Sequence, residues 1–178
     1  MFNASLIDTD DVLTWFYDAC VEAGPELCPI HESTSERIRQ RVNNVLEGLK
    51  SAPIPFVDAT SGTQGVVTYD VVKNQLFQML YSPYSSGAPF AAAFAALEAG
   101  NPVPIWSSSS DAGIQQLLIG SCIPELNEIV VDAFITAVIG CSEALPVTDT
   151  LDDLKVYYDN LVKQSSFADV WNGRAGCS

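Results

Sequence analysis

The residues with the clearest chemical potential lie close together near the start of the chain. Cys20 and Cys28 flank a Gly-Pro pair, and the only histidine, His31, follows three residues later. These groups could form a disulfide, a Cys28–His31 dyad or part of a metal site. Three ligands at this spacing match no zinc pattern, and a disulfide would consume the nucleophile of a dyad. We therefore favour a disulfide, with His31 as an exposed loop residue, and expect no metal site.

Paired carboxylates could also carry acid–base chemistry, and two clusters of them occur. They comprise Asp8, Asp10 and Asp11, and Asp149, Asp152 and Asp153. Both clusters lie where helices are expected to begin, and there the positive end of the helix dipole favours acidic side chains. The chain has neither a Gly-x-Ser-x-Gly nucleophile elbow nor a Gly-rich phosphate loop. The sequence thus predicts no catalytic residue and no cofactor within this chain.

The composition limits the classes of partner. The chain has 178 residues, 48% of them hydrophobic, which is enough for an ordinary packed core. Eight Lys and Arg against 22 Asp and Glu give a formal charge of −14, which repels phosphate backbones and anionic membranes. The longest apolar run, "EIVVDAFITAVIGC", contains Asp132 and is too short to cross a bilayer. We expect no nucleic-acid binding and no membrane span.

Cysteine usage favours an oxidising compartment. The chain holds five cysteines and one glycosylation triplet, Asn3-Ala4-Ser5. Its start, "MFNASLIDTDD", lacks the basic and apolar regions of a secretory signal. We therefore expect an exported protein, glycosylated at Asn3, whose signal lies outside this stretch.

Apolar residues recur at helical spacing in several segments. The pattern predicts helices over about residues 10–23, 34–51, 69–81, 87–100 and 150–163. Thr9 is the expected cap of the first, a Ser33–Glu36 capping box starts the second, and Thr150 with Asp153 starts the last. A further short helix is expected after Ile114.

Two segments are expected to be extended. Residues 65–69 form a short extended piece, and residues 133–140 are short, apolar and rich in strand formers. Residues 53–65 and 101–113 are predicted loops because of their Pro, Ser and Gly content. The sequence thus predicts a mainly α fold with one or two short strands. The apolar strand has no evident partner, which leaves its backbone groups unsatisfied.

An ordered series of segments covers nearly the whole chain. The series is "DTDDVLTWFYDACVEAGPELC", "LYSPY", "FAAAFAALEAGNP", "AVIGCSE", "TDTLDDLKVYYDNLVKQSSFADVW" and a terminal "GC". This series resembles the middle portion of secreted tripeptidyl-aminopeptidase-like α/β-hydrolases. Where that family commonly has Cys-Ser-Asp-Gly, this chain has Cys141-Ser142-Glu143-Ala144.

The resemblance implies a helical lid over a catalytic site that lies elsewhere. Residues 1–132 would form the lid module, and residues 133–178 would return to the α/β-hydrolase core. None of the family's catalytic residues maps onto this chain, so the resemblance predicts no activity for the chain alone. The complete enzyme would be a serine exopeptidase that releases short peptides from N-termini. Its other core segments, or a second chain, would be the partners of this one.

A lid shapes the pocket through apolar side chains that face the substrate. The pocket candidates are the aromatic residues Tyr81, Tyr84, Phe90, Phe94 and Trp106. Core packing is the more common role of buried phenyl rings, and it competes most strongly for the two phenylalanines.

The cysteines suggest a disulfide arrangement. Cys20–Cys28 would clamp the corner between the first two helices, where Gly24-Pro25 would otherwise leave a hinge. A second bridge, Cys141–Cys177, would tie the strand end to the tail, with Cys122 as the unpaired thiol.

Two functional hypotheses remain open at this point. The chain is either the lid portion of a secreted serine hydrolase, or a free-standing acidic helical binding module without enzymatic activity. The module would bind an apolar ligand or a protein partner through an exposed face.

Overall fold

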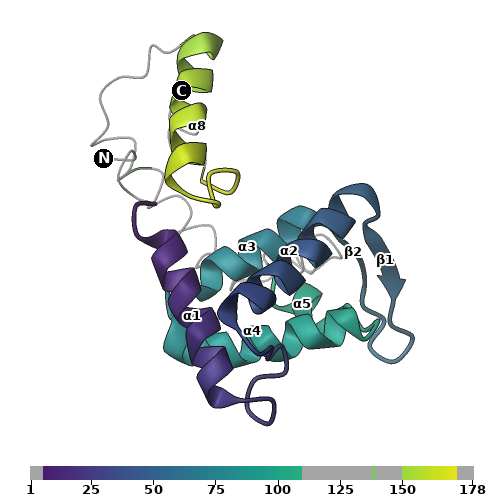
Figure 1. Ribbon diagram of the computed structural model, residues 1–178. Helices are drawn as coiled ribbons and strands as arrows, with labels where there is room; N and C mark the ends of the chain where they lie inside the picture. The colour runs from purple at the N-terminus through teal and green to yellow at the C-terminus, as the bar shows by residue number, and fades with distance from the viewer. Residues whose placement is uncertain (1–5, 110–137, 139–149, 172–178) are drawn as a thin grey trace. The chain divides into compact units, whose positions relative to one another are not determined.

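The computed structural model describes residues 6–109, 138 and 150–171 (Figure 1). The chain divides into two compact units: residues 11–116 form one, and residues 1–10 with 117–178 form the other. The described elements are α1 (Thr9–Ala23), α2 (Ser35–Ser51), β1 (Ile54–Val57), β2 (Gln64–Val67), α3 (Tyr69–Met79), α4 (Pro83–Glu98), α5 (Val103–Ser107) and α8 (Leu151–Gln164). A mainly α fold with a short strand pair is therefore confirmed. The expected division between residues 132 and 133 lies outside the described residues.

The first two helices bury the apolar stripes that their spacing predicts. α1 buries Leu13, Phe16, Tyr17 and Cys20, and α2 buries Ile38, Val42, Leu46 and Leu49. The start of α2 differs from the expected Ser33–Glu36 capping box. Thr34 is the N-cap, and its hydroxyl accepts a hydrogen bond from the Arg37 backbone N–H at 3.3 Å. The cap lies one residue later than predicted because Thr34, with φ at −148°, is the last extended residue before the helix.

α4 begins four residues before the predicted start at Gly87. Pro83 occupies the first turn, where its fixed φ suits a helix and its missing N–H costs nothing. Pro89 lies inside the helix, which removes a backbone donor from the ladder. The helix nevertheless continues, because Phe90, Phe94 and Leu97 are buried along its inner face.

α5 lies within a predicted loop. Residues 101–113 were expected to be irregular from composition, yet Val103–Ser107 forms a short helix. Burial of Ile105 and Trp106, whose exposed fractions are 1% and 7%, explains this result. Tertiary packing here overrides a local composition rich in Pro and Ser.

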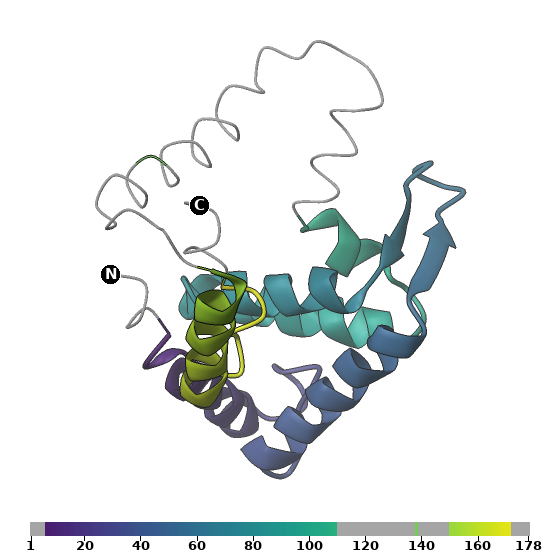
Figure 2. The same ribbon diagram turned by 90° about the horizontal axis from the view of Figure 1, so that it is seen from above.

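β1 and β2 form an antiparallel hairpin, so each of the two strands has its partner within the same unit. Ile54 lies opposite Val67, and Phe56 lies opposite Gly65. The strand expected at residues 65–69 is thus observed at Gln64–Val67, whereas β1 falls in the predicted loop 53–65. The prediction of a loop throughout 53–65 is wrong because a two-stranded sheet has only edges, and edge strands tolerate proline. The hairpin lies at one end of this helical unit, next to α5 (Figure 2).

The hairpin turn is held by the side chain of Asp58. Its carboxylate accepts hydrogen bonds from the backbone N–H groups of Thr60 at 3.1 Å and Ser61 at 3.2 Å, and from the Ser61 hydroxyl. The Ser61 hydroxyl bond, followed by the Thr60 backbone bond, lowers the pKa of Asp58 from its ordinary value. Gly62 closes the turn with φ at +72°, a conformation that favours glycine. These bonds fix the register of the two strands.

Trp106 of α5 lies directly against the backbone of β2. A Cβ placed on Gly65 would stand 2.6 Å from Cε2 of the Trp106 indole. The same indole meets Phe56 of β1 edge to face, with ring centroids 5.9 Å apart. Only glycine permits this approach, so Gly65 is the residue that lets α5 cover the hairpin.

The other unit contains α8 and the segment before Thr9. The predicted capping box is confirmed: Thr150 Oγ1 accepts from the Asp153 N–H at 3.3 Å, and the Asp153 carboxylate accepts from the Thr150 N–H at 2.9 Å. Asp10 accepts hydrogen bonds from the backbone N–H and hydroxyl of Ser166 at 2.9 and 2.6 Å. These bonds connect the start of the chain to the residues after α8.

The strand expected at residues 133–140 is described only at Val138. Val138 is helical and 48% exposed, so the prediction of a strand is wrong at that position. Short apolar runs do not distinguish a strand from a helix by periodicity alone, which explains the error. The other residues of that segment, and the short helix expected after Ile114, lie outside the described residues.

Replacement of Gly65 by alanine tests the packing of α5 on the hairpin. We expect Gly65→Ala to lower the free energy of unfolding by about 1–3 kcal/mol, because the new methyl group displaces the indole. Gly48→Ala is the matched control: Gly48 is exposed within α2 and has nothing within 4 Å of an added Cβ. It should raise stability by about 0.5–1 kcal/mol. Urea denaturation measures both, and equal effects of the two substitutions would contradict the packing.

Candidate functional site

The predicted pocket residues separate into two groups. Tyr81 and Tyr84 are exposed, by 65% and 88%, whereas Phe90, Phe94 and Trp106 are buried. The two phenylalanines stack within α4 with ring centroids 5.8 Å apart, and Tyr81 meets Phe77 of α3 at 5.5 Å. The five aromatic residues therefore do not share one face. Only Tyr84 reaches the groove described next.

An apolar groove of about 200 Å³ lies between α1, α4 and the segment that follows α1. Its lining consists almost wholly of apolar side chains. The lining residues are Trp15, Phe16, Ala19, Cys20, Ala23, Leu27, Cys28, Pro83, Tyr84, Gly87, Ala88 and Ala91. The volume is below the range of about 300–1,000 Å³ that is typical of small-molecule pockets. The groove is thus of a size for one side chain rather than a whole cofactor.

Three large apolar residues stand exposed around the groove. Trp15 is 41% exposed, Leu27 is 74% exposed and Tyr84 is 88% exposed. The Trp15 and Tyr84 rings meet edge to face across the two helices, with centroids 4.9 Å apart. Trp15 and Leu27 were not predicted as site residues. Trp15 belongs to the "TWFY" aromatic run of α1, and its neighbours Phe16 and Tyr17 are buried, so periodicity alone would have identified it as the outward-facing member.

The groove exists because the two helices present small residues to each other. Ala19 and Ala23 lie on the α1 side, and Ala88 and Ala91 lie on the α4 side. At Gly87 α4 lies close to α1, because an added Cβ would lie 3.0 Å from the Phe16 ring. The small side chains of the four alanines leave room for the groove between the helices. The width of the groove is therefore set by side-chain size.

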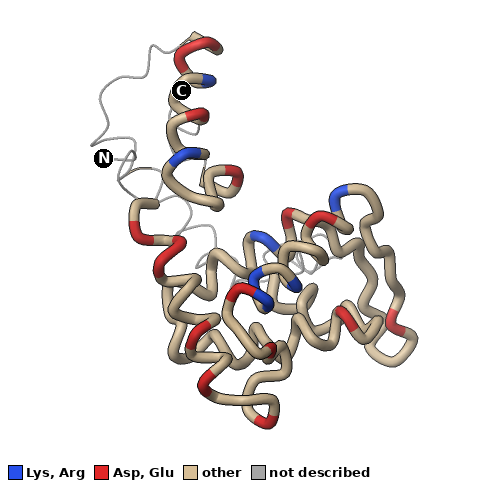
Figure 3. The backbone as a smooth tube through the Cα atoms, in the orientation of Figure 1, with Lys and Arg blue, Asp and Glu red and all other residues tan. Residues whose placement is uncertain are grey.

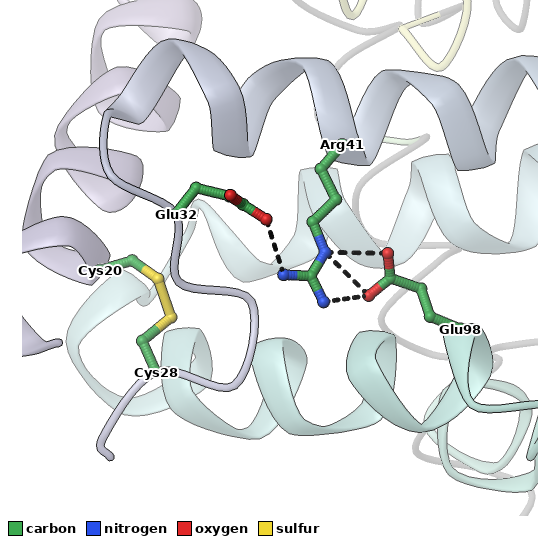
Figure 4. The surroundings of a disulfide bond; sticks show 5 residues. All are labelled: Cys20, Cys28, Glu32, Arg41 and Glu98. Carbon is green, nitrogen blue, oxygen red and sulfur yellow. Dashed lines mark hydrogen bonds and ion pairs between the residues drawn. A yellow bond between two sulfur atoms is a disulfide. The ribbon is translucent and has the colours of Figure 1, made fainter. Parts of the chain in front are cut away.

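The predicted Cys20–Cys28 disulfide is confirmed, and it lines the groove (Figure 4). The two Cα atoms are 5.4 Å apart, and both residues are buried. Between them the chain turns at Gly24, whose φ is +75° and whose carbonyl accepts from the Cys28 N–H at 2.9 Å. The bridge ties the end of α1 to the segment that leads into α2. Because it occupies Cys28, the alternative of a Cys28–His31 dyad does not apply.

A second connection joins α2, α4 and the segment before α2. The Arg41 guanidinium donates to both carboxylate oxygens of Glu98, at 2.9 and 2.7 Å, and to Glu32 at 3.3 Å (Figure 4). The hydrogen bonds with Glu98, more than the charges themselves, raise the pKa of Arg41 above its ordinary value. Such bidentate pairing holds the two helices in a fixed relation.

The remaining predicted features divide between described and undescribed residues. His31 is half-buried in the loop, so the expectation of an exposed residue holds only in part. Its backbone N–H donates to the Cys28 carbonyl at 3.0 Å. The predictions for Asn3, Cys122 and the Cys141–Cys177 bridge concern positions outside the described residues.

The described residues show neither a metal-binding cluster nor a membrane span. Across residues 6–109, 138 and 150–171, His, Cys, Asp and Glu side chains do not gather in groups of three or more that could hold a metal ion. Over the same ranges, the helices are either too short or too polar to cross a lipid bilayer.

Comparisons of the chain with protein-family models, curated proteins and solved structures find no match. The candidate site therefore stands on its own geometry.

Loss of the disulfide tests its role as a clamp. We expect the double substitution Cys20→Ser and Cys28→Ser to lower the free energy of unfolding by about 2–3 kcal/mol, as loop-closure entropy predicts for so short a loop. Alkylation of the native chain without reductant should leave both cysteines unmodified in a peptide map. Modified Cys20 or Cys28, or a double variant as stable as the native chain, would contradict the clamp.

Proposed function

We propose that the chain is an exported, acidic helical binding module and that its groove between α1 and α4 receives an apolar side chain of a partner. The single observation that carries this proposal is the exposed Trp15–Tyr84 pair at the groove. Scattered exposed apolar residues are normal on protein surfaces, but contiguous apolar patches mark interaction sites. Trp15, Leu27 and Tyr84 are contiguous around one groove.

The amphipathic character of the Trp15 and Tyr84 side chains supports the same proposal. Trp and Tyr combine large apolar area with a polar tip and lose little conformational freedom when bound, which is why they are enriched in binding surfaces. The disulfide and the Arg41–Glu98 pair hold the walls in place before any partner arrives. A preformed site loses less entropy on binding.

Two further features favour a module that folds by its own packing. The strand β2 pairs with β1 within the same unit, and the unit buries its own apolar core from α1 to α5. An unpartnered strand at residues 133–140 would require an external sheet, but Val138 is helical. At that position the chain gives no support to an external sheet.

Titration with a neutral aromatic probe, N-acetyltryptophan amide, tests the groove. In a ¹⁵N-correlated NMR spectrum of the full chain, the indole signal of Trp15 should move, while those of Trp106 and Trp171 should stay. Ala88→Gln, which fills the groove at an exposed position of α4, should abolish the shift. Ala92→Gln, on the same helix and outside the groove, is the matched control. No movement of the Trp15 signal, or equal movement in both variants, would refute the site.

The lid portion of a secreted serine hydrolase is the second candidate. It is favoured by the ordered series of segments from "DTDDVLTWFYDAC" to the terminal "GC", and by the exposure of Tyr81 and Tyr84 among the predicted pocket residues. In that role the same groove would contribute to an exopeptidase pocket. The partners would be the core segments of the hydrolase, either in one longer chain or in a second one.

A serine-directed fluorophosphonate probe, combined with the intact mass of native material, separates the two candidates. The chain alone should not be labelled under either hypothesis, because its sequence contains no nucleophile elbow. Native material should then be isolated and its intact mass measured. A chain of 178 residues without a bound partner agrees with the binding module, whereas a longer or associated chain that the probe labels at one serine supports the lid. Stoichiometric labelling of the isolated chain would exclude both.

A further inference from the structure

We infer that the partner of the groove is a basic peptide segment, in which one large apolar anchor is flanked by Lys or Arg. This inference rests on the proposed function, since it specifies what the same groove binds. It combines two independent properties of the site: the size and apolar lining of the groove, and the sign of the charge around it.

The acidic residues follow the groove along α1. Asp11 and Asp18 stand four before and three after Trp15, so helical geometry places both beside it, and Glu22 lies on the same face of α1 two turns further along. Glu26 directly precedes Leu27, the other exposed apolar residue of this wall. All four carboxylates are exposed, and none forms an ion pair with a described basic residue.

The walls carry no positive charge to offset these carboxylates. Residues 1–36, which include α1, contain no Lys or Arg, and residues 74–154, which include α4, contain none either. Figure 3 shows acidic positions but no basic ones along α1, whereas basic positions appear along α2. The carboxylates therefore make the potential negative along the α1 wall and the segment that joins α1 to α2, whereas the α4 wall from Pro83 to Leu97 carries no charged side chain.

Two basic side chains of α2 have other partners. Arg39 of α2 donates to Thr14 at 2.6 Å and lies 5.5 Å from the Tyr17 ring, on the side of α1 away from Trp15. Arg41 is engaged by Glu98 and Glu32. Neither cation is available to neutralise Asp18 or Glu22. A partner that brings its own cations thus gains from both the apolar contact and the charge.

The size of the groove favours an anchored peptide over a small apolar molecule. About 200 Å³ is room for one side chain, and an open groove leaves the flanking backbone of a peptide in water. Flanking Lys or Arg would then lie at the rim, where charge sets specificity and association rate more than affinity. The anchor supplies the contact, and the flanking charges select the sequence.

Three five-residue peptides test this inference with the full chain: Lys-Lys-Trp-Lys-Lys, Glu-Glu-Trp-Glu-Glu and Lys-Lys-Ala-Lys-Lys. Dissociation constants are obtained from the Trp15 indole signal at about 20 mM salt, where screening is weak. We expect the first peptide to bind about tenfold more tightly than the second. The third should leave the Trp15 signal unchanged. The preference for Lys should shrink at about 0.5 M salt.

A charge-matched pair of variants identifies the carboxylates responsible. The triple variant Asp18→Asn, Glu22→Gln, Glu26→Gln should reduce the preference for the Lys peptide to about twofold or less. The control variant Glu47→Gln, Asp70→Asn, Asp152→Asn removes three exposed acids outside the groove and should retain the preference. The two variants have the same net charge, so a general effect of charge would change both equally and would overturn the inference.

The outcomes also distinguish this inference from the function on which it rests. If both Trp peptides bind equally and Ala88→Gln abolishes both, the groove is confirmed and the basic partner is wrong. If Lys-Lys-Ala-Lys-Lys binds as tightly as the Trp peptide, the charges act without an anchor and the inference fails. If no Trp-containing peptide moves the Trp15 signal, the groove itself fails.

Discussion

Phe16 of α1 lies against α4 at Gly87, where an added Cβ would stand 3.0 Å from the phenyl ring. The same ring meets Phe90 edge to face, with centroids 6.2 Å apart. This contact joins the core to the surface: the ring packs inward on Phe90, and its edge forms the floor of the groove. Because interiors are close-packed, a larger residue at position 87 would separate the two helices and alter both. The position of Trp15 relative to Tyr84 thus depends on the size of one buried glycine.

The disulfide and the ion pair fix the same arrangement from different directions. Cys20–Cys28 holds the end of α1 to the segment that precedes α2, and Arg41 ties α2 to Glu98 at the end of α4. The two connections involve different elements, so neither replaces the other. Together they constrain both helices of the groove through α2. A groove fixed in this way presents Trp15 and Tyr84 in one arrangement, which reduces the ordering cost of binding.

Sequence reasoning predicted the helices and the clamp better than the site. Periodicity located α1, α2 and α3 because their buried faces repeat at helical spacing, and the Cys20–Cys28 pairing followed from a short span around Gly24. It missed β1 and α5, which depend on contacts between residues distant in sequence: Trp106 of α5 packs against Gly65 of β2 and Phe56 of β1. It also favoured buried aromatic residues as pocket candidates. Composition does not state which side of a helix is covered. The spacing of Trp15 next to buried neighbours marks it as outward-facing, and its contact with Tyr84 identifies it as part of a site.

The distribution of the eight basic residues gives the groove its remaining property. Three of those on α2 have partners within the fold: Arg39 donates to Thr14, Arg41 binds Glu98 and Glu32, and Lys50 pairs with Glu47 at 2.7 Å. These cations are engaged on α2, and α1 contains no Lys or Arg, so every charged side chain of α1 is acidic. An acidic rim around an apolar groove repels acidic partners. Neutral apolar partners are not repelled, but they gain nothing from the charge. Arg41 thus holds α2 to α4 and is engaged away from α1, so the carboxylates of α1 are left to select a basic partner.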